Sequence, residues 1–302
     1  MIRIVERKMP DGTVAKVQPF HVSMKGLENA LLCRDTKDYD AIVKYMAICA
    51  RRKNVIIIIY AVVSNHGHAA VLAISQADAD MFGEEWKRMC AMWLRSKYKE
   101  KGILKKVDTK AILLDDDWYV RRALAYIPRN AIDNKESVQD YPWSGFRAMF
   151  RTAPETGKRV AFLTKREREA IMHTGDSLKD VPWVLDDNGF LIPDSFCDKE
   201  YLEQVFNHDQ AFFLRLIGDV DVGEMQEKLE DAPRTMLKDS DFYKFAEDCS
   251  LRWFKKEVSA LPNEKKMRLL SYLWRSRKTT VNQLARVLGL ERESVRKGLR
   301  KK

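Results

Sequence analysis

Two histidines, His66 and His68, stand one residue apart directly after the most apolar run of the chain. They lie in the stretch NHGH, which follows VIIIIYAVVS at residues 55–64. The β-branched run indicates a buried strand, and side chains two positions apart on a strand leave the same face of the sheet. Two imidazoles on one face can bind one divalent ion. The alternative is a hydrogen-bonded histidine pair at a sheet edge, and so short a motif does not separate the two interpretations.

A second candidate group lies in WYVRRALAYIPRNA, at residues 118–131. Tyr126 and Asn130 are four residues apart, so they share one face if the segment is a helix. An amide oxygen is an acceptable third ligand for a hard ion such as Mg²⁺ or Mn²⁺. A tyrosine beside such an ion could attack a phosphodiester. The alternative is an ordinary core or surface tyrosine on an amphipathic helix.

The elements that must position these residues alternate between strand and helix patterns. We expect strands at 19–26, 55–63, 66–75 and 107–114, and helices at 36–53, 84–102 and from 115 onward. Thr36 is expected to cap the first helix, and Gly102 to end the second. The resulting order, β-α-β-β-α-β followed by a helix, predicts an α+β, ferredoxin-like sheet with helices on one face. The other face would be open and could carry an active site.

The end of the chain is strongly basic. Residues 264–302 contain thirteen Lys or Arg and three Glu, so they account for the whole formal charge of +10. TTVNQLARVLGLERESVRKGLRKK predicts a helix, a turn at Gly289 and a second helix. The side chains expected to face outward from the second helix are Arg292, Ser294, Arg296, Lys297 and Arg300. This is the pattern of a DNA-binding helix-turn-helix, and the alternatives are a helical hairpin that only packs on its neighbour or a solvated basic tail.

Length and composition predict a two-domain chain. We expect a catalytic domain at 1–152, a linker with a short helix at 153–199, and a helical domain at 200–302 whose helix-turn-helix occupies 264–302. Five scattered cysteines without CxxC spacing favour reduced core residues and a cytoplasmic protein. With the expected DNA binding, we expect the protein to be nucleoid-associated. The sequence shows neither a secretory signal nor an apolar run long enough to span a membrane.

Taken in order, FHVSMKG, VSNHGH, DDDWYVRRALAYIPRNA and YPWSGF resemble the conserved stretches of single-tyrosine HUH transposases. The branch that looks most similar is the REP-associated tyrosine transposases. The resemblance covers about residues 15–150. Three positions depart from the family pattern: Gly67 stands where an apolar residue is usual, Pro128 lies inside the helix and is expected to kink it, and Ala131 replaces a proline.

The resemblance implies a function. In such proteins the histidine pair and a helix-borne amide hold Mg²⁺ or Mn²⁺, here His66, His68 and Asn130. The tyrosine four residues before the amide, here Tyr126, cleaves single-stranded DNA beside a hairpin, forms a 5′-phosphotyrosine and frees a 3′-OH. Tyr119 resembles a family tyrosine that is not the nucleophile.

Two rival functions remain open from the sequence. One is a domesticated, non-catalytic DNA-binding regulator that keeps the fold. The other is an RNA-binding module, which would need exposed aromatic residues on the central strands, where the run at 55–63 offers only Tyr60. The expected partners are single-stranded DNA and, through the C-terminal domain, duplex DNA. A homodimer is also left open.

Overall fold

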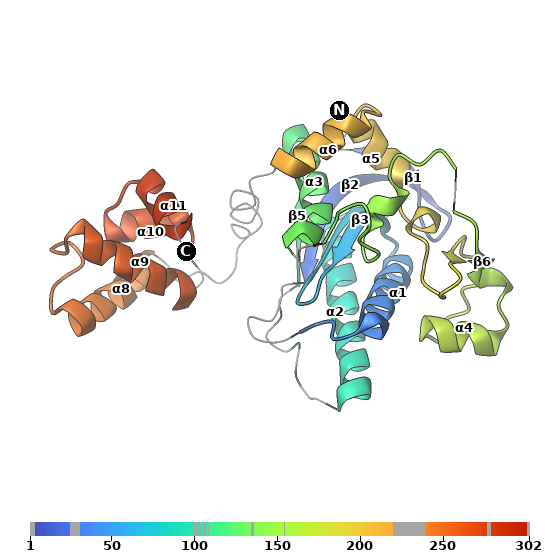
Figure 1. Ribbon diagram of the computed structural model, residues 1–302, viewed down its shortest axis with the longest axis horizontal. Coiled ribbons are helices and arrows are strands. Elements are labelled where there is room, and N and C mark those ends of the chain that lie inside the picture. Colours follow the sequence, from blue (N-terminus) through green and yellow to red (C-terminus); the bar gives the residue numbers. More distant parts are fainter. Residues whose placement is uncertain are drawn as a thin grey trace. The chain divides into compact units, whose positions relative to one another are not determined.

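The computed structural model divides the chain into two compact units, Met1–Val220 and Asp221–Lys302. It is a mixed α/β structure, and Figure 1 shows the sheet in the first unit and helices in the described part of the second. The residues that the structure describes are 4–24, 31–99, 102, 104, 107, 109–133, 136–153, 155–219, 239–276 and 279–300.

The sheet of the first unit is antiparallel and is centred on a long strand, β2 (Val14–Met24). β4 (Gly67–Ala73) pairs with one edge of β2, and β5 (Thr109–Leu113) pairs with the other. β3 (Ile56–Val62) lies outside β4, and β1 (Val5–Lys8) pairs with the start of β2. The resulting neighbour order is β3-β4-β2-β5, which joins strands that are far apart in the sequence.

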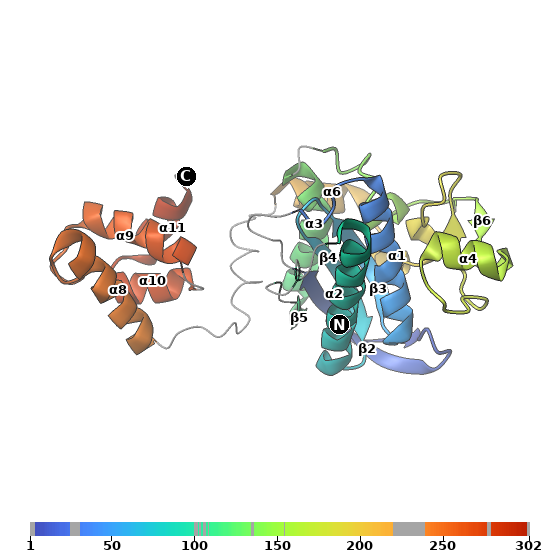
Figure 2. The same cartoon turned by 90° about the horizontal axis from the view of Figure 1, so that it is seen from below.

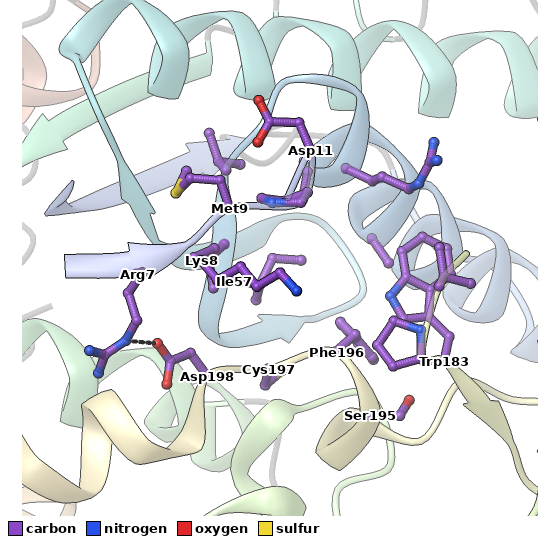
Figure 3. A pocket seen from close by; sticks show the side chains of 18 of the residues that line it. Arg7, Lys8, Met9, Asp11, Ile57, Trp183, Ser195, Phe196, Cys197 and Asp198 are labelled. Atoms are coloured by element: carbon purple, nitrogen blue, oxygen red, sulfur yellow. Dashed lines mark hydrogen bonds and ion pairs between the residues drawn. The ribbon is translucent and has the colours of Figure 1, made fainter. Parts of the chain in front are cut away.

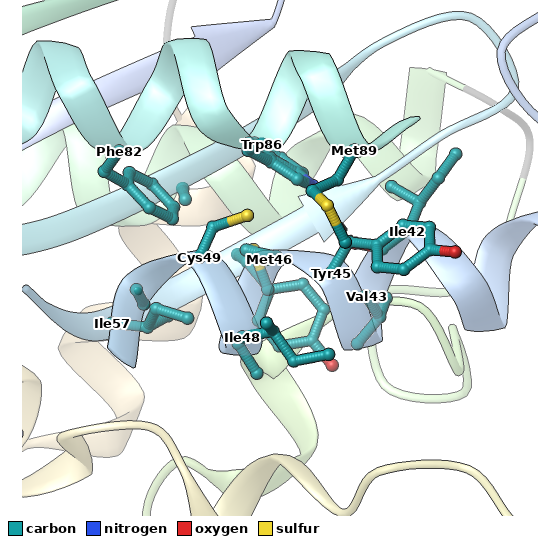
Figure 4. Packing of buried hydrophobic residues seen from close by; sticks show 14 of the residues in the cluster. Ile42, Val43, Tyr45, Met46, Ile48, Cys49, Ile57, Phe82, Trp86 and Met89 are labelled. Atoms are coloured by element: carbon teal, nitrogen blue, oxygen red, sulfur yellow. Dashed lines mark hydrogen bonds between the residues drawn. The ribbon is translucent and has the colours of Figure 1, made fainter. Parts of the chain in front are cut away.

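Two helices cover one face of this sheet. α1 (Thr36–Arg52) precedes β3, and α2 (Gln76–Tyr98) follows β4. Figures 1 and 2 show them side by side, and Figure 4 shows the apolar side chains of both helices in the core between them. Apolar residues recur every three or four positions along each helix, which places them on the face that packs on the sheet.

The ends of both helices differ from expectation. The residue that caps α1 is Asp35 and not Thr36, because the Asp35 carboxylate accepts a hydrogen bond from the Asp38 amide. α2 begins earlier than expected, after a capping box formed by Ser75 and Asp78. It ends at Tyr98, before Gly102, because Lys99 adopts the left-handed conformation at φ 57°.

The second face of the sheet is not open, contrary to expectation. α3 (Asp117–Asp133) packs on β3 and β4, and α5 (Lys199–Val205) also contacts β3. β4 is buried along its whole length and β3 almost so. The apolar run gives the reason, because a strand without alternating polar residues needs cover on both faces.

The YPWSGF stretch closes the free edge of β3. Val62 donates its amide to Trp143 O at 2.9 Å, and the Tyr141 hydroxyl donates to Val62 O at 2.7 Å. The Ser144 hydroxyl donates to Tyr60 O at 3.2 Å. An uncovered strand edge exposes unpaired backbone groups, so this stretch has a structural role in the sheet.

α3 continues through Pro128 to Asp133 and does not end at the proline. It therefore keeps Tyr126 and Asn130 one turn apart on one face. The loss of one backbone donor at Pro128 does not remove Asn130 from the helix.

The segment predicted as a linker belongs to the first unit, which extends to Val220 and so past the predicted boundary at 200. The predicted short helix is present as α4 (Lys165–Met172). A small hairpin joins β6 (Lys158–Arg159) to β7 (Val184–Leu185), and α5 is followed by α6 (Gln210–Asp219). The segment is ordered because its apolar residues enter the main core, namely Val160, Leu163, Met172, Leu178, Trp183, Leu185 and Leu191.

The described part of the second unit is helical, as predicted. Its helices are α8 (Asp239–Phe254), α9 (Asn263–Ser276), α10 (Val281–Leu288) and α11 (Arg292–Arg300). They share a core that includes Leu284, Val287 and Val295. A further helix expected at 222–229 lies outside the described residues.

All five cysteines are free thiols, and four of them are buried. In the described part of the chain, no helix combines the length and apolar character needed to cross a membrane.

Candidate functional site

His66 and His68 lie where β3 turns back into β4. Gly67 pairs with Val62 of β3 and with Met24 of β2, so the pair stands beside the end of the central strand. The two rings are 4.9 Å apart, centroid to centroid, and nearly perpendicular at 80°. His68 is 7% exposed. Both histidines therefore belong to one cluster, as their spacing predicted.

The position of Trp86 gives a structural reason for the glycine between the two histidines. A Cβ at this position would lie 2.8 Å from Cη2 of Trp86. The Trp86 indole is buried on the α2 face of the sheet, where its Nε1 donates to Ile42 O at 3.1 Å. A side chain at position 67 would thus enter the space that Trp86 fills, and the histidines on either side turn to the opposite face.

That opposite face is the one covered by α3, and α3 brings Asn130 to the histidines. Asn130 is 2% exposed, and its Oδ1 lies 3.0 Å from His66 Nε2. Its amide nitrogen donates to Tyr126 O and to Ile127 O, both at 3.0 Å. These two donations fix the orientation of the amide, because a flipped amide would direct its oxygen at two carbonyls.

The hydrogen-bond partners of His66 place two lone pairs against each other. His66 Nδ1 lies 2.7 Å from Asn65 Oδ1, and an amide oxygen only accepts hydrogen bonds. A neutral His66 that donates from Nδ1 has no hydrogen on Nε2, which then faces the Asn130 oxygen. Two acceptors 3.0 Å apart repel unless a cation lies between them. Two other solutions exist without an ion: a turned Asn65 amide that donates to Nδ1 and leaves the hydrogen on Nε2, or a doubly protonated His66 that donates from both nitrogens.

The donor set suits a hard divalent ion. Adjacent ligand atoms at about 2.1 Å from an octahedral Mg²⁺ lie about 3 Å apart. The separation of His66 Nε2 and Asn130 Oδ1 has this value, 3.0 Å. His68 would add a second imidazole. No group of three His, Cys, Asp or Glu side chains suited to a metal occurs among the described residues, so a metal site here would need the Asn130 amide as a third ligand.

A third histidine, His21 of β2, completes the cluster, and the sequence prediction gave it no role. Its Nε2 lies 3.0 Å from His68 Nδ1, and the ring is 1% exposed. Burial lowers the pKa of His21 to about 3. Burial also lowers the pKa of His68 well below its ordinary value, with smaller effects of His66 and His21. Both rings are therefore neutral at physiological pH.

The available signal for His21 was its position between apolar residues, Phe20 and Val22, on a predicted strand. Only the pairing of β2 with β4 shows what it contacts, because Ser23 stands opposite His68 and His21 stands opposite Ala70. His21 is thus the diagonal neighbour of His68 on one face of the sheet.

Tyr126 stands against this cluster. Its ring centroid lies 5.4 Å from that of His68 and 6.1 Å from that of His21, in edge-on arrangements. Tyr126 is 3% exposed, so α3 and the sheet enclose it. Tyr119, the other tyrosine of this helix, is 7% exposed, and burial raises its pKa to about 12.

The basic residues predicted to bind DNA lie on the last helix of the second unit. Arg292, Ser294 and Lys297 are exposed, and Arg296 is half-buried. Val295 is fully buried on the opposite side and anchors the helix to the core. The turn before the helix contains Gly289 at φ 59°, a left-handed conformation that suits glycine. The side chain of Arg300 lies outside the described residues.

Two other features contribute nothing to the histidine cluster. α2 is on the other face of the sheet, and three of its basic residues are paired: Lys87 with Glu84 at 2.8 Å, Arg88 with Glu85 at 2.7 Å and Lys97 with Asp38 at 2.8 Å. Tyr60 is 1% exposed, so it cannot present its ring to a nucleic-acid base. The RNA-binding alternative needed an exposed aromatic residue on this strand, and Tyr60, the one aromatic residue of the run at 55–63, is buried.

A cavity of about 710 Å³ lies near the opposite end of β3 from the histidines (Figure 3). Its wall includes Ile57, Trp183 and Cys197. The charged groups around it are partly neutralised, because Arg7 pairs with Asp198 at 2.7 Å and Arg51 pairs with Asp180 at 2.6 Å.

Comparison with known proteins found no family model, no curated protein and no solved structure that matches this chain.

Proposed function

We propose that the protein is a metal-dependent single-stranded DNA endonuclease and strand transferase that uses Tyr126 as its nucleophile. The observation that carries the proposal is the meeting of His66 Nε2 and Asn130 Oδ1 at 3.0 Å, with the Tyr126 ring 5.4 Å from that of His68. These residues come from two elements that are remote in sequence. The strand order β3-β4-β2-β5 is that of a ferredoxin-like βαββαβ sheet, which supports the resemblance to single-tyrosine HUH transposases.

His66, His68 and Asn130 would hold Mg²⁺ or Mn²⁺. When bound, such an ion polarises a phosphate and stabilises developing charge. Neighbouring groups of the protein orient the side chains of Asn130 and His66. The two backbone carbonyls that accept from Asn130 fix its oxygen toward His66, and Asn65 contacts the far nitrogen of the same ring. Ligands held in this way need little rearrangement.

Tyr126 would attack the phosphorus of a phosphodiester. A bond forms between the phenolic oxygen and phosphorus, and the bond from phosphorus to the 3′ oxygen breaks. The phenolic proton leaves and the departing 3′ oxygen gains a proton, so a 5′-phosphotyrosine and a free 3′-OH result. Attack by a 3′-OH on the phosphotyrosine reverses these steps and joins strands.

The C-terminal unit would bind duplex DNA through α11. α10, the turn at Gly289 and α11 have the order of a helix-turn-helix, and the exposed Arg292, Ser294 and Lys297 are donors suited to phosphates and base edges. Such a unit would deliver the first unit to its target.

The test uses the full-length protein, Mn²⁺ and a pool of hairpin-bearing single-stranded oligonucleotides, followed by denaturing electrophoresis. A 3′ label should migrate with the protein, and a 5′ label should appear on a shorter free strand. Tyr126→Phe removes only the hydroxyl, so the adduct should disappear. Tyr119→Phe is the matched control on the same helix and should keep the adduct. If the Tyr126 variant still forms it, the nucleophile is misassigned.

A second candidate function is a non-catalytic DNA-binding regulator, and the burial of Tyr126 at 3% exposure favours it. A DNA strand must reach the Tyr126 hydroxyl to react with it, and in this structure Tyr126 is enclosed between α3 and the sheet. This candidate predicts salt-dependent DNA binding, no adduct with any oligonucleotide, and no effect of chelator on binding.

A further inference from the structure

We propose that His21 is a positioning residue that keeps a hydrogen on Nδ1 of His68, so that His68 presents the bare Nε2 to a divalent ion. The proposal rests on the proposed metal site and adds to it a residue on another strand. It starts from the 3.0 Å contact between His21 Nε2 and His68 Nδ1.

Two arrangements of hydrogens are possible in this pair of neutral rings. In one, His68 donates from Nδ1 to His21 Nε2, and His68 Nε2 is free to bind an ion. In the other, His21 donates from Nε2, and His68 carries its own hydrogen on Nε2, where a metal would have to bind. A neutral imidazole has one hydrogen, so only the first arrangement is competent for binding through Nε2.

The surroundings of His21 direct it to His68. The ring is 1% exposed, and its Nδ1 is buried without a hydrogen-bond partner among the described residues. When His21 accepts at Nε2, its own hydrogen is on Nδ1 and has no acceptor there, so binding of an ion at His68 Nε2 must offset the cost of that unpaired donor. Metal-bound histidines commonly donate their second ring hydrogen to a carboxylate or carbonyl. Here the acceptor is a third imidazole on the neighbouring strand.

The test compares Mn²⁺ affinity of the full-length wild type with that of two variants, measured by isothermal titration calorimetry. His21→Leu fills the space but cannot accept a hydrogen bond, and should weaken binding by about 10–100-fold. His21→Gln can place an amide oxygen near the position of Nε2 and should restore affinity to within a few-fold of the wild type. Equal loss in both variants means that the ring only fills space, and overturns the proposal.

Nuclear magnetic resonance of the ¹⁵N-labelled wild type gives a second readout that does not need a folded variant. With Mg²⁺ bound, the hydrogen of His68 should be on Nδ1. A hydrogen on Nε2 overturns the proposal even if both variants fail to fold. Mn²⁺ affinity unchanged in both variants overturns the role of His21 alone, whereas a wild type that binds no ion overturns the metal site as well.

Discussion

The histidine cluster and the basic face of α11 differ in how they are built. The cluster joins residues from β2, the β3–β4 turn and α3, and its members His21, Tyr126 and Asn130 are all at most 3% exposed. The face of α11 comes from nine consecutive residues, of which Arg292, Ser294 and Lys297 are exposed. One is a mostly buried site and the other an exposed charged surface.

This difference predicts different responses to mutation. In a buried site most polar atoms have a fixed partner, and loss of one partner leaves another atom unpaired in a dry environment. On an exposed basic surface the charges act through solvent and each contributes a small share. Single substitutions should therefore have large effects in the first unit and small, additive ones in the last helix.

The largest effect of a single substitution, on the free energy of unfolding, is expected at Asp38, a fully buried carboxylate in the first unit. It accepts hydrogen bonds from Lys97 Nζ at 2.8 Å, Tyr98 OH at 2.6 Å and Trp93 Nε1 at 2.8 Å. Burial alone would raise the pKa of Asp38, but these bonds together lower it below the ordinary 3.8. Asp38→Asn should reduce the free energy of unfolding at neutral pH by about 3 kcal/mol.

The pH dependence of that effect has a definite sign. A lowered pKa stabilises the folded state above the ordinary value, and this stabilisation is lost as pH falls through the lower folded pKa. The stability difference between wild type and Asp38→Asn should be constant above about pH 5 and shrink as pH falls below about 4. Urea unfolding at several pH values measures it, and a difference independent of pH would contradict the assignment.

Asn130→Ala tests the histidine cluster itself. It removes the proposed third ligand, and Mn²⁺ affinity should fall by about 100-fold or more, at least as much as for loss of an outer-shell partner. Duplex DNA binding by the C-terminal unit should not change. Asn188→Ala, at an exposed turn, is the control. Calorimetry with Mn²⁺ and a filter-binding assay with duplex DNA separate the two outcomes, and unchanged Mn²⁺ affinity would remove Asn130 from the site.

Gly67→Ala tests why the histidine pair has a glycine between its members. Its Cβ would lie 2.8 Å from the Trp86 ring, which its own hydrogen bond holds in place. We expect a loss of about 1–3 kcal/mol in unfolding free energy from overpacking. Gly175→Ala, where no atom lies within 4 Å of the added Cβ, should have little effect. Combining Gly67→Ala with Trp86→Phe should recover part of the loss, and a purely additive double variant would contradict the contact.

The smallest effect is expected on α11. Replacing both Arg292 and Lys297 by alanine should weaken duplex DNA binding several-fold and reduce the slope of log affinity against log salt by about 2. Lys165→Ala, on the exposed face of α4, is the charge control in the first unit. Fluorescence anisotropy across a salt series measures the slope. An unchanged slope would mean that α11 does not contact phosphates.

The local pattern of the sequence predicted the longer helices and four strands of the main sheet, but not β1, β6 or β7. Apolar periodicity marked α1, α2 and the C-terminal helices, and the β-branched run marked β3. The two-residue period of a strand placed His66 and His68 on one side, and the helical period placed Tyr126 and Asn130 together. The basic face of α11 was also visible in the sequence, because charge and periodicity within one helix are local properties.

Contacts between segments were decided only by the tertiary structure. The pairing of β2 with β4 brings His21 to His68, and no feature of FHVSMKG alone indicates that neighbour. The same holds for segment 153–199, whose turn-rich composition suggested a linker although its apolar residues enter the core. The closed second face of the sheet follows from the packing of α3 and α5, and the YPWSGF stretch closes the edge of β3. Sequence periodicity shows which way a side chain points, but the partner it meets depends on which strands and helices pack together.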